Sequence, residues 1–191
     1  MSKDAKQAGQ GKLILGIDPA LGTTGYGVIR ESVGRLEVVD AGIVRCKRKE
    51  SLENRLLELH EGITEIVQEH RPDCLAVEEL YTHYERPTTA ILMGHARGVI
   101  LLAAAKAEIP VFSYAATQIK KTLTGNGRAP KNQMQFAVKH QLGLKELPEP
   151  ADVADALAAA VTHCHLTLPN PLLTPHLAPN PALAELLKSQ Q

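Results

Sequence analysis

The sequence is poor in aromatic residues and contains no tryptophan, with four tyrosines and two phenylalanines among 191 residues. We therefore expect an aliphatic core. Cysteine is scarce too: Cys46, Cys74 and Cys164 lie far apart, and no Cys-x-x-Cys occurs. This spacing excludes a disulfide framework and a zinc ribbon, and predicts three reduced thiols. Neither charge sign is in excess, because 21 Lys and Arg balance 21 Asp and Glu.

Long apolar runs are missing as well. No run approaches the roughly 20 apolar residues of a membrane span, so we expect no membrane segment. Residues 1–11 are polar and lack an apolar signal region, which indicates a flexible leader and a cytoplasmic protein. The length suits a single domain, which we expect over residues 12–166. Five prolines in residues 167–191 predict a Pro-rich C-terminal tail.

The apolar periodicity predicts an α/β fold. Three consecutive strands are expected first, and helices then alternate with two short strands. Because hairpins join the early strands and helical crossovers reach the later ones, we expect a mixed five-stranded sheet with helices on both faces. The strands are expected over 13–17, 24–30, 36–45, 74–77 and 110–112, and the helices over 52–70, 88–108, 115–123, 131–142 and 151–165.

Four carboxylates occupy the ends of these elements. Asp18 closes the first strand, Glu78 closes the fourth, and Asp152 and Asp155 share a face at the start of the last helix. Such a cluster repels itself unless hard divalent cations such as Mg²⁺ or Mn²⁺ neutralise it. Two ions about 3.5–4 Å apart would support phosphodiester cleavage. Each carboxylate taken alone is more simply explained as a turn residue, a solvated side chain or a helix cap.

Four motifs in unbroken order over Lys12–His165 resemble the RuvC family of crossover junction endodeoxyribonucleases, the Holliday junction resolvases. They are Gly16-Ile17-Asp18-Pro19 with Thr24–Ile29, Ala76–Glu79, Gly94–Val99, and Ala151–Ala158 with Thr162–His165.

The resemblance implies an RNase H-like fold and a homodimer that resolves Holliday junctions by paired symmetrical nicks in homologous recombination and DNA repair. Asp18, Glu78, Asp152 and Asp155 would be catalytic and would bind two Mg²⁺ per subunit, with Mn²⁺ as a substitute. The products would carry 5′-phosphates, and the RuvA–RuvB branch-migration complex would be a partner. The sequence departs from the family at Ala20-Leu21-Gly22, where a basic residue is often found.

Gly94 and Gly98 lie on a stripe of small residues in the helix expected over 88–108. Such a stripe fits either a close helix contact within the chain or a subunit interface. The resemblance implies the interface.

Charge is segregated along the chain. Residues 110–145 hold six cations and no Asp or Glu, whereas residues 31–85 hold thirteen of the 21 acids. A solvated helix face and a phosphate-binding surface both fit the basic stretch. The resemblance puts Lys120 and Lys131 near the active site and the DNA backbone, with Lys120 stabilising charge on the scissile phosphate. Lys121 and Arg128 are expected to make further backbone contacts.

Tyr81 lies three residues after Glu78 and is either a core aromatic or a platform on which an unpaired base stacks. The family carries an aromatic here, commonly Phe, and Tyr84 is a second candidate. His163 and His165 do not share a helix face, so we interpret them as packing residues rather than metal ligands.

Three other functions are compatible with parts of the sequence. They are a non-catalytic junction-binding protein of the same fold, an RNase H-like nuclease acting on another nucleic acid, and an ATP-handling relative of acetate kinase and actin. The last would need a second domain and a second Gly-rich phosphate motif, which the sequence lacks. The complete carboxylate set and the Gly94–Val99 segment favour the junction nuclease.

Overall fold

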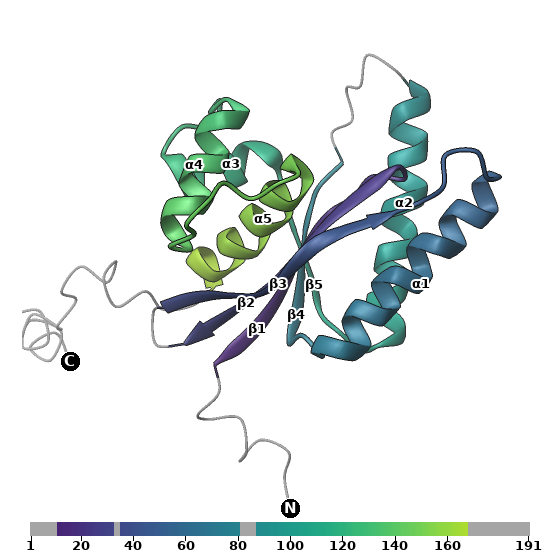
Figure 1. The fold of residues 1–191 in the computed structure, drawn as a ribbon, viewed down its shortest axis with the longest axis horizontal. Helices are drawn as coiled ribbons and strands as arrows, with labels where there is room; N and C mark the ends of the chain where they lie inside the picture. Colours follow the sequence, from purple (N-terminus) through teal and green to yellow (C-terminus); the bar gives the residue numbers. More distant parts are fainter. Residues whose placement is uncertain (1–10, 33–34, 81–86, 168–191) are drawn as a thin grey trace, which may run out of the picture.

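A computed structural model describes residues 11–32, 35–80 and 87–167 of the chain (Figure 1). Its order of elements is the predicted one. The strands are β1 (Lys12–Asp18), β2 (Thr23–Ser32), β3 (Arg35–Arg45), β4 (Cys74–Glu78) and β5 (Val111–Tyr114), and the helices are α1 (Leu52–His70), α2 (Pro87–Lys106), α3 (Ala116–Thr124), α4 (Lys131–Gln141) and α5 (Ala151–Thr167).

The five strands form one mixed sheet in the order β3-β2-β1-β4-β5, as predicted. β1, β2 and β3 pair antiparallel, whereas β4 and β5 run parallel to β1. Parallel neighbours need crossovers, and α1 and α2 supply them. Because Ile17 is in register with Val77, the carboxyl ends of β1 and β4 lie side by side. Asp18 and Glu78 therefore end adjacent strands at the same edge of the sheet.

Helices cover both faces of the sheet (Figure 1). α3, α4 and α5 share one apolar cluster with one face, and α1 and α2 share a second cluster with the other. The largest fully buried side chains are Ile, Leu and Val. The expectation of an aliphatic core is confirmed.

α5 packs unusually close to the sheet because β1 and β2 present glycines to it. A Cβ atom on Gly16 would lie 2.1 Å from the carbonyl oxygen of Ala156, and one on Gly25 would lie 1.9 Å from that of Asp152. Both distances are far shorter than van der Waals contact. The absence of side chains at these two positions thus sets the distance between α5 and the sheet, and with it the position of the first turn of α5.

α2 departs from a sequence expectation. Its segment Thr88–Lys106 has a mean hydropathy of 1.4 and is long and apolar enough to cross a membrane by length and composition, so the expectation that no run approaches such a span is wrong. Only 22% of that segment is buried. Ile100 is buried against the sheet and α1, whereas Ile91 and Leu102 are 59% and 54% exposed. α2 therefore presents an apolar outer face.

The histidines near the end of α5 are packing residues, as predicted. The Nδ1 atom of His163 lies 2.7 Å from the Tyr114 hydroxyl, and its Nε2 atom lies 3.2 Å from the Cys74 thiol. His165 hydrogen-bonds to the side chain of Gln141. All three cysteines are free and buried, which confirms the expectation of reduced thiols.

Candidate active site

The four predicted carboxylates come from three elements that meet at one edge of the sheet. Asp18 and Glu78 end the neighbouring strands β1 and β4, and Asp152 and Asp155 lie in the first turns of α5. The close packing of α5 on Gly25 holds the backbone of Asp152 against β2. The register between β1 and β4 and the short distance between α5 and the sheet therefore bring carboxylates that are far apart in the sequence, such as Asp18 and Asp155, close together.

Asp18 experiences the strongest electrostatic effect at this edge. Burial raises its pKa from 3.8 to about 7, and the carboxylates of Asp155, Glu78 and Asp152 add to the rise, while Lys131 opposes it. An ionised carboxylate is unfavourable there because it loses hydration and faces like charges. Asp18 is thus the carboxylate that gains most from an added positive charge.

Two lysines partly neutralise the other carboxylates. Burial raises the pKa of Glu78, with a further rise from Asp155, and Lys120 and Lys131 oppose both. Burial also raises the pKa of Asp155, although the Lys131 ammonium lies 3.3 Å from its Oδ2 atom. Because α4 begins at Lys131, the packing of α4 on α5 delivers this cation. The site combines acids from the sheet and α5 with cations from α3 and α4.

A cleft of about 220 Å³ opens beside these groups. It is lined by two acids, two lysines and four apolar residues: Glu78, Asp155, Lys120, Lys131, Ala116, Ile119, Met134 and Ala158. Acidic and basic side chains therefore line the same cleft. Such a cleft suits a ligand that brings both cations and an anion, as a metal-bound phosphate does.

The donor set fits hard divalent cations. All four groups are carboxylates, which Mg²⁺ and Mn²⁺ prefer. Burial raises the pKa of three of them and neighbouring acids add to the rise, so a bound cation would stabilise their ionised forms. In the described part of the chain, no three His, Cys, Asp or Glu side chains stand close enough together to hold an ion. The carboxylates thus share a neighbourhood without converging on one point.

The raised pKa of Asp18 predicts a pH-dependent stability for metal-free protein. Between pH 4 and 7 the folded state binds more protons at Asp18 than the unfolded state, so this group lowers the free energy of unfolding as pH rises. Asp18→Asn removes the penalty. At pH 8 in a chelator it is expected to stabilise the protein by on the order of 4 kcal/mol, because each pKa unit between 3.8 and about 7 contributes about 1.4 kcal/mol.

Urea denaturation of both proteins from pH 4 to pH 8 measures this effect. The gain should shrink as pH falls from 7 toward 4, because Asp18 becomes protonated in the folded state over this range, and it should vanish only below the unfolded-state pKa of 3.8. Equal unfolding free energies at pH 8 would show that the carboxylate is not destabilised by its surroundings.

The remaining candidates are distributed as follows. Lys120 is half-buried and lines the cleft, whereas Lys121 and Arg128 are exposed and do not. Tyr81 and Tyr84 lie outside the described residues. The structure therefore brings Lys120 and Lys131 to the carboxylates and leaves Lys121 and Arg128 on the nearby surface of α3 and its following turn.

Arg97 is a site residue that the sequence analysis did not single out. Its Nε atom donates to the Glu78 carbonyl oxygen at 3.4 Å, and its Nη2 atom donates to the Ser113 hydroxyl at 2.6 Å. The guanidinium of α2 thus ties together the ends of β4 and β5. Its one sequence signal is a cation inside an otherwise apolar helix.

Comparison with protein families gives a match over most of the chain. The family model of crossover junction endodeoxyribonuclease RuvC matches residues 14–163. A protein of that name from Rhodopirellula baltica is 53% identical over 164 residues, which cover 86% of this chain and 92% of the relative. Another from Desulforamulus reducens is 46% identical and covers 79% and 92%.

Solved structures give the same result. The structure described as T. thermophilus RuvC in complex with Holliday junction substrate superposes with a TM-score of 0.76 and 34% identity, covering 81% of this chain and 93% of that one. The yeast mitochondrial Holliday junction resolvase Ydc2 matches with a TM-score of 0.57 at 12% identity, which shows likeness of fold alone.

Proposed function

The chain belongs to the RuvC family of crossover junction endodeoxyribonucleases, and from this we propose that its carboxylate cleft resolves four-way DNA junctions by paired nicks. The observation that carries the proposal is the group of three carboxylates whose pKa is raised, two of which line one cleft together with Lys120 and Lys131. A nuclease needs such a cluster, whereas a passive binding surface gains nothing from it.

Asp18, Glu78, Asp152 and Asp155 would hold the divalent ions, two Mg²⁺ per subunit with Mn²⁺ as a substitute. When bound, such ions polarise an attacking water and offset charge on the scissile phosphate. Water adds to phosphorus in line, the bond from phosphorus to the 3′ oxygen breaks, and a proton passes to that oxygen. The products carry a 5′-phosphate and a 3′-hydroxyl.

The two lysines of the cleft would have a role separate from metal binding. Lys120 and Lys131 lie beside the carboxylates, where an ammonium group stabilises negative charge that develops on the phosphate. Lys131 is drawn to Asp155 in the free protein, so a bound phosphate competes for it. Lys121 and Arg128 would contact the DNA backbone, and Tyr81 would stack on an unpaired base at the crossover.

A homodimer would place two such clefts on one junction. Ile91, His95, Gly98, Leu102 and Ala105 share one face of α2 at heptad-like spacing and are exposed. A Cβ atom on Gly98 would meet nothing within 4 Å, so no contact within the described residues requires a glycine at this position. A second copy of α2 would cover this apolar face, which accounts for its membrane-like composition in a DNA-acting enzyme.

The remaining features of the proposal follow from the family. The nuclease domain spans residues 12–166, between the leader of residues 1–11 and the Pro-rich tail of residues 167–191. The protein would act in the cytoplasm during recombination and repair, with the RuvA–RuvB complex as its branch-migration partner.

A nicking assay on a mobile four-way junction tests the proposed function. With Mg²⁺ we expect one nick in each of two like strands at symmetrical positions, ligatable ends, and no cutting in EDTA. The mapped positions of the nicks also test the proposed dimer, because a single subunit would not be expected to cut two strands at symmetrical positions. Matched linear duplex and RNA–DNA hybrid serve as controls.

Two outcomes would replace the proposal. Junction binding without nicking in Mg²⁺ or Mn²⁺ would make the chain a non-catalytic binding protein. Faster cutting of the hybrid than of the junction would make it a nuclease for another nucleic acid.

A further inference from the structure

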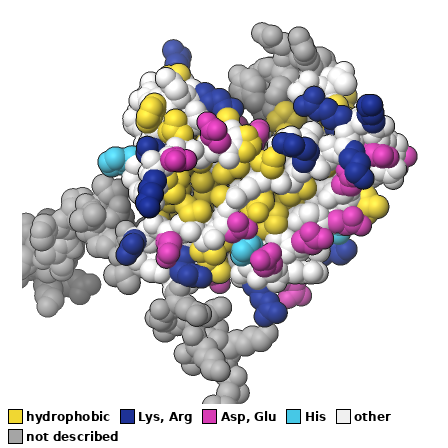
Figure 2. Space-filling model, viewed as in Figure 1, with side chains coloured by type: hydrophobic (Ala, Val, Ile, Leu, Met, Phe, Trp, Pro, Cys, Tyr) yellow, Lys and Arg dark blue, Asp and Glu magenta, His cyan; other side chains and the backbone are white. Residues whose placement is uncertain are grey.

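The turn between β3 and α1 is strongly basic, although the first half of the sequence is dominated by acids. Four cations in five residues, which we call the basic turn, are exposed: Arg45, Lys47, Arg48 and Lys49. In the space-filling view, dark-blue side chains gather at the right-hand end of the molecule, over the end where Figure 1 draws this turn (Figure 2). Such a cluster is outside the cleft and is not used by the nuclease chemistry.

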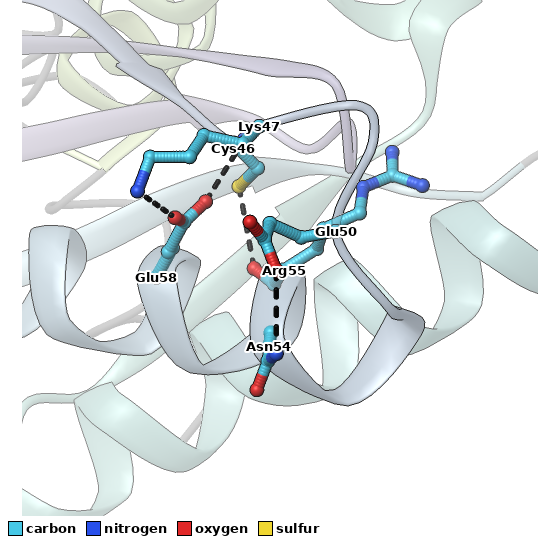
Figure 3. Close-up of polar contacts among 6 residues, drawn as sticks. All are labelled: Cys46, Lys47, Glu50, Asn54, Arg55 and Glu58. Atoms are coloured by element: carbon cyan, nitrogen blue, oxygen red, sulfur yellow. Dashed lines mark hydrogen bonds and ion pairs between the residues drawn. The ribbon is translucent and has the colours of Figure 1, made fainter.

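The basic turn is fastened to the loop that follows Asp18. Arg45 is in register with Thr23, the first residue of β2, and the Cys46 N–H donates to the Gly22 carbonyl oxygen at 3.2 Å. The Cys46 thiol also donates to the Arg55 carbonyl oxygen at 3.3 Å, which joins the turn to α1 (Figure 3). The turn therefore has a fixed place at the same end of the sheet as Asp18.

Most of this positive charge is not neutralised within the molecule. Lys47 pairs with Glu58, whose Oε1 lies 3.4 Å from the Nζ atom and whose Oε2 accepts the Lys47 N–H at 2.9 Å. Across the described residues, Arg45, Arg48 and Lys49 have no carboxylate within ion-pair distance. The turn thus offers three exposed cations held on a backbone whose position is fixed.

Arg55 adds a cation on the side of the turn nearest to the Asp18 loop. In the close-up its guanidinium points away from Glu50 and Glu58 (Figure 3). Its Nη2 atom donates to the Leu21 carbonyl oxygen at 3.4 Å, and its buried Nε–H has no partner among the described residues. Leu21 lies in the segment Ala20-Leu21-Gly22, where the family often carries a basic residue. Arg55 therefore brings positive charge from α1 to a loop that has none of its own.

We propose that the basic turn, with Arg55 behind it, binds the sugar–phosphate backbone of a junction arm beyond the cleft. The inference rests on the proposed function and extends it to a second contact surface. A duplex arm leaving the cleft along this edge of the sheet would exchange counterions for Arg45, Arg48 and Lys49. Contacts of this kind position the arm without reading its sequence.

Single-turnover nicking of a long-armed junction in Mg²⁺, with protein and salt both varied, tests the proposal. The variant is R48A/K49A, and the matched control is K12A/R35A, which removes the same charge from exposed residues at the opposite end of the sheet. We expect R48A/K49A to raise the half-saturating protein concentration on the order of tenfold in 0.1 M salt. The salt slope should fall by about 1.8, at about 0.9 per lost phosphate contact. On a junction with arms too short to reach the turn, the variant should match the wild type.

Each outcome bears on one claim. If R48A/K49A keeps the wild-type half-saturation and salt slope while the wild type nicks normally, the arm contact is wrong. The turn would then be free for another partner, such as an acidic protein. An equal loss in K12A/R35A would show a general charge effect and also overturn the proposal. If the wild type nicks no junction, the proposed function itself fails.

Discussion

Asp18→Asn is expected to abolish junction nicking, by a factor on the order of 10³ or more, while binding to the junction stays nearly unchanged. Asp18 is the carboxylate whose pKa is raised most clearly, to about 7, by burial and by three neighbouring acids. Asparagine keeps the shape of the side chain but cannot supply the negative charge that holds a divalent cation. Nicking rates and junction affinity are measured on the same preparation.

Two further measurements separate this loss from other causes. The same substitution is expected to stabilise the metal-free protein, so inactivity cannot be assigned to unfolding. Glu79→Gln is the matched control, because Glu79 adjoins Glu78, is exposed, and uses its backbone N–H to bond the Tyr114 carbonyl oxygen at 2.9 Å. Retention of wild-type nicking by Asp18→Asn would remove Asp18 from the catalytic set.

The fold was predictable because its signals are local. Apolar runs such as Leu13–Ile17 and Cys74–Val77 specify buried strands, and the helical spacing over residues 52–70 specifies α1. The errors lie at element ends. β5 extends to Tyr114 because its pairing with β4 continues to Glu78, although Ser113 interrupts the apolar pattern. Pairing between strands decides such an end, and a single segment does not reveal it.

The positions of the acids could be predicted from the residue pattern itself, whereas Lys120 and Lys131 were expected near them only from the family resemblance. Asp18 and Glu78 stand where strands end, and parallel pairing brings strand ends together. Which cations meet them depends on contacts between distant segments. Lys131 reaches Asp155 through the packing of α4 on α5, and Arg97 reaches Glu78 through the position of α2. The basic turn was overlooked for the opposite reason, since the acids of residues 31–85 conceal it in any sum over the sequence.

Gly25→Ala is expected to lower nicking by about 100-fold and to destabilise the protein by about 1–3 kcal/mol. A Cβ atom at this position would lie 1.9 Å from the carbonyl oxygen of Asp152 and 2.3 Å from its carbonyl carbon. Both atoms belong to the backbone, so no rotamer change relieves the clash. The first turn of α5 must move away from β2 and carry Asp152 with it. Nicking rate and thermal unfolding temperature are the two readouts.

Substitutions at two neighbouring glycines serve as controls for Gly25→Ala and test an alternative explanation of its effect. Gly27→Ala meets the Leu157 side chain, with Cδ2 at 2.5 Å, which can adjust, so its loss in both readouts should be smaller. A Cβ atom on Gly22 meets nothing within 4 Å, so Gly22→Ala should leave the unfolding temperature near that of the wild type. If Gly25→Ala behaves like Gly22→Ala, the contact between β2 and α5 does not set the position of Asp152. If instead Gly27→Ala costs as much activity as Gly25→Ala, general loosening of α5 explains the loss. Only a nicking loss concentrated at Gly25 ties the geometry of the carboxylate cluster to the absence of one methyl group in the sheet.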